Sequence, residues 1–353
     1  MKCLCLAPRT LLIACVAVLC VAAAATSQDD EVKAQEPPVV SSRVGDNRNF
    51  YDWIQGWGTL PEGVKFGNTH GGVVVDKSGR VYMNTDSENA VIVFEEDGTF
   101  VKGFGKELAN GLHGMAINEE DGVEYLYLTH LGRHEVLKTT LDGEILWKIG
   151  YPEECEAYTD AGQYKPTGVA VAPNGDVYVG DGYGLGYIHQ YDKEQKYVRS
   201  WGGSGTEDGK FRTPHGLIVD PLGPKRWRIV VADRENGRIQ IFDQEGNWID
   251  TMDEGLRRPC HLTRWGDGRN RKFGVADLAG RVTILNYKHR VETQLGDQPD
   301  PGKRANNGVA REHWKDGEFL APHSSGFDAH GNLYVIDWLA LGRVTKLVRK
   351  KTD

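Results

Sequence analysis

Thr213 to Phe242 read TPHGLIVDPLGPKRWRIVVADRENGRIQIF, the clearest copy of a unit that the chain repeats between Phe66 and Arg349. Each unit has a Pro or Gly, often a His, a short apolar run, a turn, a second apolar run that often ends in Asp, and a third run. The six openings are NTHGGVVVD (68–76), GLHGMAIN (111–118), KPTGVAVAP (165–173), TPHGLIVDP (213–221), RPCHLTRW (258–265) and APHSSGFDA (321–329).

The runs inside each unit alternate apolar and polar residues and are rich in β-branched and aromatic side chains, which is typical of antiparallel strands. Turn pairs such as Asp97-Gly98, Asp142-Gly143 and Asn174-Gly175 separate successive runs. A spacing of roughly 43 to 60 residues, with three or four strands per unit, indicates a β-propeller, because one small sheet cannot bury both faces without neighbours. The sequence therefore predicts an all-β fold, a six-bladed β-propeller.

The last unit lacks a fourth strand, because the chain stops soon after the run at 343–348. FYDWIQGWG (50–58), ahead of the first unit, has the fourth-strand pattern and no partner of its own. We expect this N-terminal strand to complete the sixth blade and close the ring, which removes an open sheet edge. Residues 50–353 are then one domain.

The N-terminus has the pattern of a secretory signal peptide over residues 1–25, with Lys2 and Arg9, a short apolar run, and AAAA before Thr26. That run is short for a membrane span. Residues 26–49, acidic at first and containing Pro37-Pro38, are expected to be a flexible linker. These features predict a secreted or periplasmic monomer without a membrane span.

The formal net charge is −8, and removal of residues 1–25 takes away two bases and no acid, which leaves −10. An acidic chain without long Lys/Arg runs has no electrostatic footprint for nucleic acid. Of the six cysteines only Cys155 and Cys260 would remain after cleavage. They are expected to be unpaired thiols, since sequence alone cannot place them within bonding distance.

In a propeller the first strand of each blade lines the central channel, so the residue at the start of that strand lies at one mouth of it. Across the units this opening position holds His70, His113, Thr167, His215, Cys260 and His323. His113, His215 and His323 come from alternate blades and would face one axis, which suits a metal ion with an open coordination position. A single His there would more often be a hydrated lining residue, and His70 falls outside the alternating pattern.

The units resemble NHL repeats, and several segments resemble peptidyl-α-hydroxyglycine α-amidating lyase. GLHGMAI, TPHGLIV and APHSS match the blade openings that carry the zinc ligands of that family, so the resemblance implies zinc on His113, His215 and His323. VYVGDGYG matches the segment with the catalytic base, which implies that role for Tyr183, and VADRENGRIQIF implies an active-site role for Arg234. The implied substrate is a peptide with a C-terminal α-hydroxyglycine, or another small molecule.

The sequence also departs from the family. The stretch after the second strand of the first unit, VYMNTDSEN, lacks the family's Arg, and the Asp of the family's structural calcium site is Ser324 here. Asp-Gly-Tyr is followed by Gly-Leu-Gly-Tyr, so the family's Cys and Asn at this place are missing, and so are its paired cysteines.

Other interpretations remain open at this level. Tyr183 could fill the channel mouth, and Arg234 could pair with an acid of a neighbouring blade. Asp residues that close the second strands, at 181, 233, 277 and 337, are read as turn caps. A non-enzymatic NHL propeller that binds a protein or glycan partner is the main alternative function. A calcium-dependent lactonase is a weaker one, because such channels favour carboxylate ligands. The insert at 298–317 is read as a surface loop.

Overall fold

The computed structural model describes residue 1, residues 38–46 and residues 49–350 of the chain. The predicted signal peptide, apart from Met1, and residues 26–37 of the predicted linker lie outside this part. The described residues from 38 onward make up one compact unit. No helix among the described residues is both long enough and apolar enough to span a bilayer.

Six antiparallel sheets form the fold, as predicted, and sheets one to five have four strands each. Their bounds, blade by blade, are β3 (Val73–Val75), β4 (Val81–Asn84), β5 (Val91–Phe94) and β6 (Phe100–Phe104); β7 (Leu112–Glu120), β8 (Val123–His130), β9 (Glu135–Thr140) and β10 (Ile145–Ile149); β11 (Gly168–Val171), β12 (Val177–Gly180), β13 (Tyr187–Tyr191) and β14 (Tyr197–Gly202); β15 (Pro214–Gly223), β16 (Arg226–Asp233), β17 (Arg238–Phe242) and β18 (Trp248–Met252); β19 (Pro259–Trp265), β20 (Lys272–Asp277), β21 (Arg281–Asn286) and β22 (Val291–Leu295).

The sixth blade has five strands, in the order β1 (Val40–Asp46), β2 (Asn49–Ile54), β25 (Arg343–Arg349), β24 (Leu333–Asp337) and β23 (Pro322–Phe327). Short 3-10 turns lie between strands, at η1 (Lys106–Leu108), η2 (Ala161–Gln163), η3 (Arg234–Asn236), η4 (Gly268–Asn270), η5 (Pro301–Lys303) and η6 (Arg311–His313).

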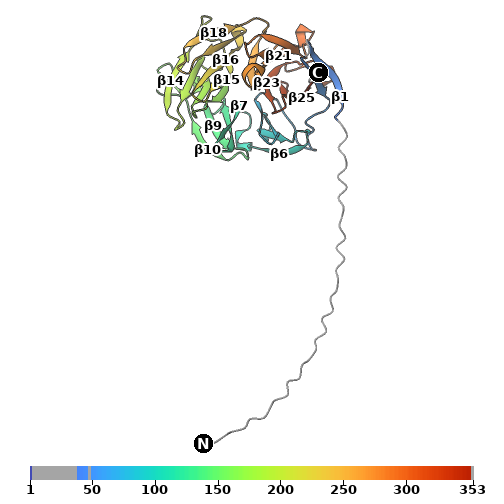
Figure 1. The fold of residues 1–353 in the computed structure, drawn as a ribbon, viewed down its shortest axis with the longest axis horizontal. Coiled ribbons are helices and arrows are strands. Elements are labelled where there is room, and N and C mark those ends of the chain that lie inside the picture. Colours follow the sequence, from blue (N-terminus) through green and yellow to red (C-terminus); the bar gives the residue numbers. More distant parts are fainter. Residues whose placement is uncertain (2–37, 47–48, 351–353) are drawn as a thin grey trace. The chain divides into compact units, whose positions relative to one another are not determined.

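The first strand of every blade faces the centre of the ring, and the fourth lies at its rim. In Figure 1 the labels β7, β15 and β23 lie near the centre, whereas β6, β10, β14 and β18 lie at the outside. Each inner strand contacts the inner strand of the next blade, and β23 contacts β3, so the ring is closed. Apolar side chains fill the space between neighbouring sheets, as where Val73 and Met83 of the first blade pack with Tyr334 and Ile336 of the sixth.

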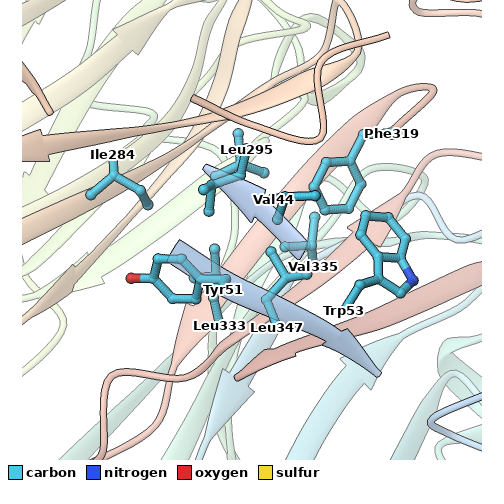
Figure 2. Packing of buried hydrophobic residues seen from close by; sticks show 10 residues of the cluster. Val44, Tyr51, Trp53, Ile284, Leu295, Phe319, Leu333, Val335 and Leu347 are labelled. Atoms are coloured by element: carbon cyan, nitrogen blue, oxygen red, sulfur yellow. The ribbon is translucent and has the colours of Figure 1, made fainter. Parts of the chain in front are cut away.

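The N-terminal strand closes the ring as expected. β2 pairs with β25 in an antiparallel register that places Trp53 opposite Leu347. Figure 2 shows Trp53 and Tyr51 of β2 beside Leu347 and Val335 of the same blade, with Leu295 of the fifth blade nearby. All of these side chains are buried, so the junction of the two chain ends has a hydrophobic core of its own.

One boundary of the prediction is wrong. The linker predicted over 26–49 does not include Val40–Asp46, which forms β1 and adds a fifth strand to the sixth blade. Val44 of β1 is buried against the fifth blade, and the Asp46 N–H donates to Thr293 Oγ1 at 2.9 Å. The β-branched residues Val40 and Val44 are only a weak strand signal, and the nearby acidic and Pro-rich composition obscured it.

The insert at 298–317 contains the 3-10 turns η5 and η6. Its Asn307 carbonyl accepts a hydrogen bond from Ala340 N at 3.1 Å, which ties the insert to the loop between β24 and β25. Ala305 packs against the small buried cluster around Cys260 and Ala321. The insert is therefore held against the same face of the ring as the opening positions.

Candidate metal centre

Backbone irregularities aim four of the opening residues into the channel. In β7, β15, β19 and β23 the pairing with the second strand shifts register across His113, His215, Cys260 and His323, respectively. Such a β-bulge leaves a residue out of the ladder and redirects its side chain, and bulges are frequent beside functional sites. The side chains of these four residues are buried.

The three predicted metal ligands converge. The ring centres of His113 and His215 are 4.7 Å apart, those of His215 and His323 are 4.8 Å apart, and those of His113 and His323 are 4.9 Å apart. Imidazoles that bind one zinc ion at ~2.0–2.1 Å have ring centres about 5 Å apart. The ring centres thus have about the spacing of a shared metal site, while, among the described residues, the potential ligand atoms within 4.8 Å of one another form two sets that meet at His323, one with His70 and His113 and one with His215 and Cys260.

Backbone carbonyls of the intervening blades fix the tautomer of each imidazole. His113 Nδ1 lies 2.8 Å from Thr167 O, His215 Nδ1 lies 2.9 Å from Cys260 O, and His323 Nδ1 lies 2.9 Å from Gly71 O. A carbonyl can only accept, so each Nδ1 carries the hydrogen and each Nε2 presents a lone pair. This orientation of a metal-binding His by a carbonyl is common in proteins.

Two of these lone pairs have no partner among the residues that the structure describes. His113 Nε2 and His323 Nε2 are buried without a hydrogen bond. Leaving a buried polar atom unpaired costs about 1–3 kcal/mol, so such atoms point to a missing ligand. Burial also holds the pKa of His113, His215 and His323 well below the ordinary value, which keeps the rings neutral and able to bind a cation. The donor set therefore fits zinc or another metal that prefers imidazole.

Tyr183 and Arg234, the two predicted catalytic residues, meet beside these rings. Tyr183 follows β12, and its phenol oxygen lies 3.0 Å from His215 Nε2. Arg234 Nη1 donates to the same oxygen at 3.1 Å, while its Nε donates to Glu235 at 2.8 Å. Burial raises the pKa of the Tyr183 phenol, and the Arg234 charge opposes that shift. In the sequence, two strands of the third blade and two of the fourth separate these residues, and the fold brings them together.

The remaining opening positions hold His70, Thr167 and Cys260. Cys260 Sγ lies 3.3 Å from His215 Nδ1, and burial raises the pKa of its thiol to about 11. Within the part of the chain that the structure describes, Cys155 and Cys260 are both free, as expected. His70 is half-buried, and its ring centre lies 4.7 Å from that of His113. Burial, together with the Arg234 charge, lowers the pKa of His70 to about 4.

The residues at the family's calcium position do not fit that ion. Ser324 Oγ is 3.2 Å from His261 Nδ1 and accepts a hydrogen bond from Val73 N at 3.4 Å. Calcium prefers several charged or carbonyl oxygens, and a neutral hydroxyl already in hydrogen bonds adds no charge. We derive nothing further from a structural calcium.

The Asp residues that end the second strands act as turn caps, as interpreted from sequence. Asp277 accepts from the N–H groups of Arg257 and Arg258, and Asp337 accepts from those of Leu320 and Ala321. Asp181 accepts from Lys165 N and Leu185 N, each at 2.6 Å, and so holds the loop that carries Tyr183. Tyr158, which donates to Asp181 at 2.5 Å, was not singled out from the sequence, because nothing local marks it.

Fold and site together define a six-bladed NHL-type β-propeller with a cluster of buried imidazoles at one mouth of its channel. The chain is similar to NHL repeat-containing protein 3 of Homo sapiens, at 31% identity over 205 residues that cover 55% of this chain and 57% of that protein. It is also similar to peptidyl-alpha-hydroxyglycine alpha-amidating lyase 1 of Drosophila melanogaster, at 31% identity over 294 residues that cover 76% of this chain and 50% of that protein.

The chain thus spans about half the length of these curated relatives. No protein-family model matches it. Among solved structures, a streptogramin B lyase superposes with a TM-score of 0.56 at 14% identity, covering 81% of this chain and 97% of the other. At that identity the likeness concerns the fold alone.

Proposed function

We propose that this protein is a secreted, zinc-dependent lyase that cleaves a C-terminal α-hydroxyglycine from a peptide, releasing a peptide amide and glyoxylate. The observation that carries the proposal is the set of three converging imidazoles with Tyr183 and Arg234 beside them. The similarity to a relative named as an amidating lyase supports the choice of substrate. Secretion is proposed from the N-terminal sequence alone.

Tyr183 is the residue placed to move a proton. As phenolate it would take the proton of the substrate hydroxyl, whose O–H electron pair forms the new carbonyl of glyoxylate. The C–N bond breaks, its electron pair stays on the amide nitrogen, and Tyr183 returns the proton to that nitrogen. Nothing is oxidised or reduced, and no water is consumed. This is general acid–base catalysis by one group.

Arg234 prepares Tyr183 for this role. Its guanidinium donates to the phenol oxygen, which favours the phenolate and fixes its direction. Glu235, which binds Arg234 Nε and is itself held by Arg258 at 2.7 Å, keeps the guanidinium in place. A zinc ion on His113, His215 and His323 would supply Lewis-acid polarisation of a substrate oxygen and further favour the phenolate.

The first test is metal content, followed by turnover. Purified protein should hold about one zinc per chain by mass spectrometry, and His215→Ala should hold much less. The zinc-loaded protein should then release glyoxylate from an α-hydroxyglycyl peptide. A protein that binds no transition metal after zinc loading, or that is inert toward such peptides, would contradict the proposal.

A second candidate function is binding of a protein or glycan partner without catalysis. It is favoured by a cavity of about 880 Å³ lined by Trp57, Phe66, Trp314 and Leu341, next to the loop between β24 and β25. The name of NHL repeat-containing protein 3, a relative of similar identity, states no activity. This function predicts that replacing His113, His215 and His323 together by Ala leaves partner binding intact.

A further inference from the structure

His70 lies close to two of the three imidazoles, those of His113 and His323. Its ring centre is 4.7 Å from that of His113 and 4.8 Å from that of His323, the same spacings that relate the predicted ligands to one another. One nitrogen each of His70, His113 and His323 lie within 4.8 Å of one another. His70 therefore belongs to the cluster in space, although it comes from a blade outside the alternating set.

The backbone around His70 is held tightly. Thr69 N donates to Leu339 O at 3.3 Å, and the Thr69 hydroxyl donates to the Asp337 carbonyl, so the segment is tied to the sixth blade. A Cβ on Gly71 would come within 2.3 Å of Asn84 Cβ, and one on Gly72 within 2.6 Å of Met115 Cβ. The close packing of these two glycines fixes the place from which the His70 side chain starts.

The same segment also orients a predicted ligand. The Gly71 carbonyl accepts the hydrogen bond from His323 Nδ1, so the residue that follows His70 sets the tautomer of His323. Trp338 packs against the His70 ring, with ring centres 5.6 Å apart and planes at 36°. Residues 69–71 thus do two things at the site: they present one imidazole and orient another.

The inward nitrogen of His70 has only a weak partner. His70 Nε2 lies 3.5 Å from the Tyr183 oxygen, beyond the usual length of a hydrogen bond, whereas His215 Nε2 is 3.0 Å from the same oxygen. His70 Nε2 is therefore available to bind a metal. When no metal is bound to it, the Tyr183 hydroxyl is a nearby hydrogen-bond partner.

We infer that His70 is a fourth, exchangeable ligand of the metal in the resting protein and that the substrate displaces it. Four neutral imidazoles form a closed donor set that suits zinc, whereas a catalytic zinc keeps a position open for substrate. Displacement of His70 opens that position, and the released imidazole turns to the Tyr183 hydroxyl. The inference rests on the proposed metal centre and adds to it a ligand from the first blade.

X-ray absorption on the zinc-loaded full chain tests this, with the number of imidazoles per zinc as the readout. The wild-type protein should show four imidazoles, and His70→Ala should show three with one light oxygen ligand. Zinc affinity, measured by competition with a chelator, should fall at least about tenfold in His70→Ala. Substitution of residues that only hydrogen-bond to a metal ligand already lowers metal affinity by about 10–100-fold. His330→Ala, which removes an exposed imidazole, is the matched control and should change neither readout.

The outcomes separate the two proposals. Three imidazoles in the wild-type protein, unchanged in His70→Ala, overturn the role of His70 and leave the lyase proposal standing. Four imidazoles without any release of glyoxylate support His70 and overturn the lyase. Absence of bound zinc overturns both. The number of imidazoles per zinc in the wild-type protein decides the question on its own, so the test does not depend on the folding of His70→Ala.

Discussion

Two groups of buried histidines in this propeller are built in opposite ways. His189 on β13 lies 3.0 Å from the Tyr158 oxygen through Nε2 and 2.6 Å from Ser200 Oγ through Nδ1. Tyr158 gives its own proton to Asp181, so His189 Nε2–H donates and Nδ1 accepts from Ser200. The imidazoles at the channel mouth carry their hydrogen on Nδ1 instead, and His113 and His323 leave Nε2 bare.

This difference distinguishes a structural buried histidine from one that can bind a ligand. Around His189 the polar atoms satisfy one another, and that cluster holds a loop. At the channel mouth the Nδ1 atoms of His113, His215 and His323 have backbone partners. The Nε2 atoms of His113 and His323 have none among the residues that the structure describes. Equal burial thus accompanies a structural role in one place and a ligand-binding geometry in the other.

The largest expected effect comes from Tyr183→Phe. If Tyr183 carries the proton as proposed, removing its phenol oxygen should lower glyoxylate release by about 10²–10⁴-fold. Zinc content and thermal unfolding should stay near those of the wild type, because the ring remains in place. Turnover that survives the substitution would show that the proton carrier is another group.

Next in size is the contrast between His215→Ala and His189→Gln. Loss of one of the converging imidazoles should weaken zinc binding by about 100-fold or more, whereas loss of His189 should leave zinc affinity unchanged. Chelator competition on both variants measures this. Equal losses in the two variants would mean that the distinction between the two groups of histidines is wrong.

Tyr158→Phe should act on stability and not on metal binding. It leaves Asp181 and His189 without a shared partner in a buried place, at a cost of about 1–3 kcal/mol in the free energy of unfolding. Urea denaturation of the two proteins gives the difference. Turnover at a temperature well below the unfolding midpoint serves as the control, and its loss without any change in stability would instead assign Tyr158 to positioning Tyr183 through Asp181.

The smallest effect is a pH dependence from His189, whose pKa burial lowers to about 3. In the unfolded chain the pKa is about 6.5, so below that pH the unfolded state binds a proton that the folded state excludes. His189 therefore adds stability above pH 6.5 and loses it as the pH falls toward 3, at about 1.4 kcal/mol per pH unit. In metal-free buffer, the slope of stability against pH between 6 and 5 should be smaller in His189→Gln by that amount. Identical slopes would mean that His189 is protonated in the folded protein.

Much of the fold follows from the repeat. The six openings, the alternating runs and the unpartnered strand before the first unit predict six blades and the manner of closure, because a propeller leaves no other place for that strand. β1 escaped prediction, since its pairing depends on contacts with the fifth blade, such as the one from Asp46 to Thr293. Long-range pairing of an edge strand leaves little trace in local composition.

The residues of the candidate site could be predicted from the sequence, but their orientation could not. The position at the start of each blade predicts His113, His215 and His323, and the motif around Tyr183 predicts that residue. The bulges that turn these side chains inward, and the carbonyls that set their tautomers, depend on register between strands, which sequence does not display. His70 looked like an exception to the pattern until its distances to His113 and His323 were known.

The closure of the ring has a consequence for assembly. β2 pairs with β25, so the sixth blade cannot form until the chain has been synthesised through Arg349. The hydrogen bond from His323 to Gly71 crosses this last seam, between the sixth blade and the first. A donor set shared by His323, His113 and His70 therefore exists only in the closed ring. A metal that binds there would bind the closed ring and not the open one, and would stabilise closure.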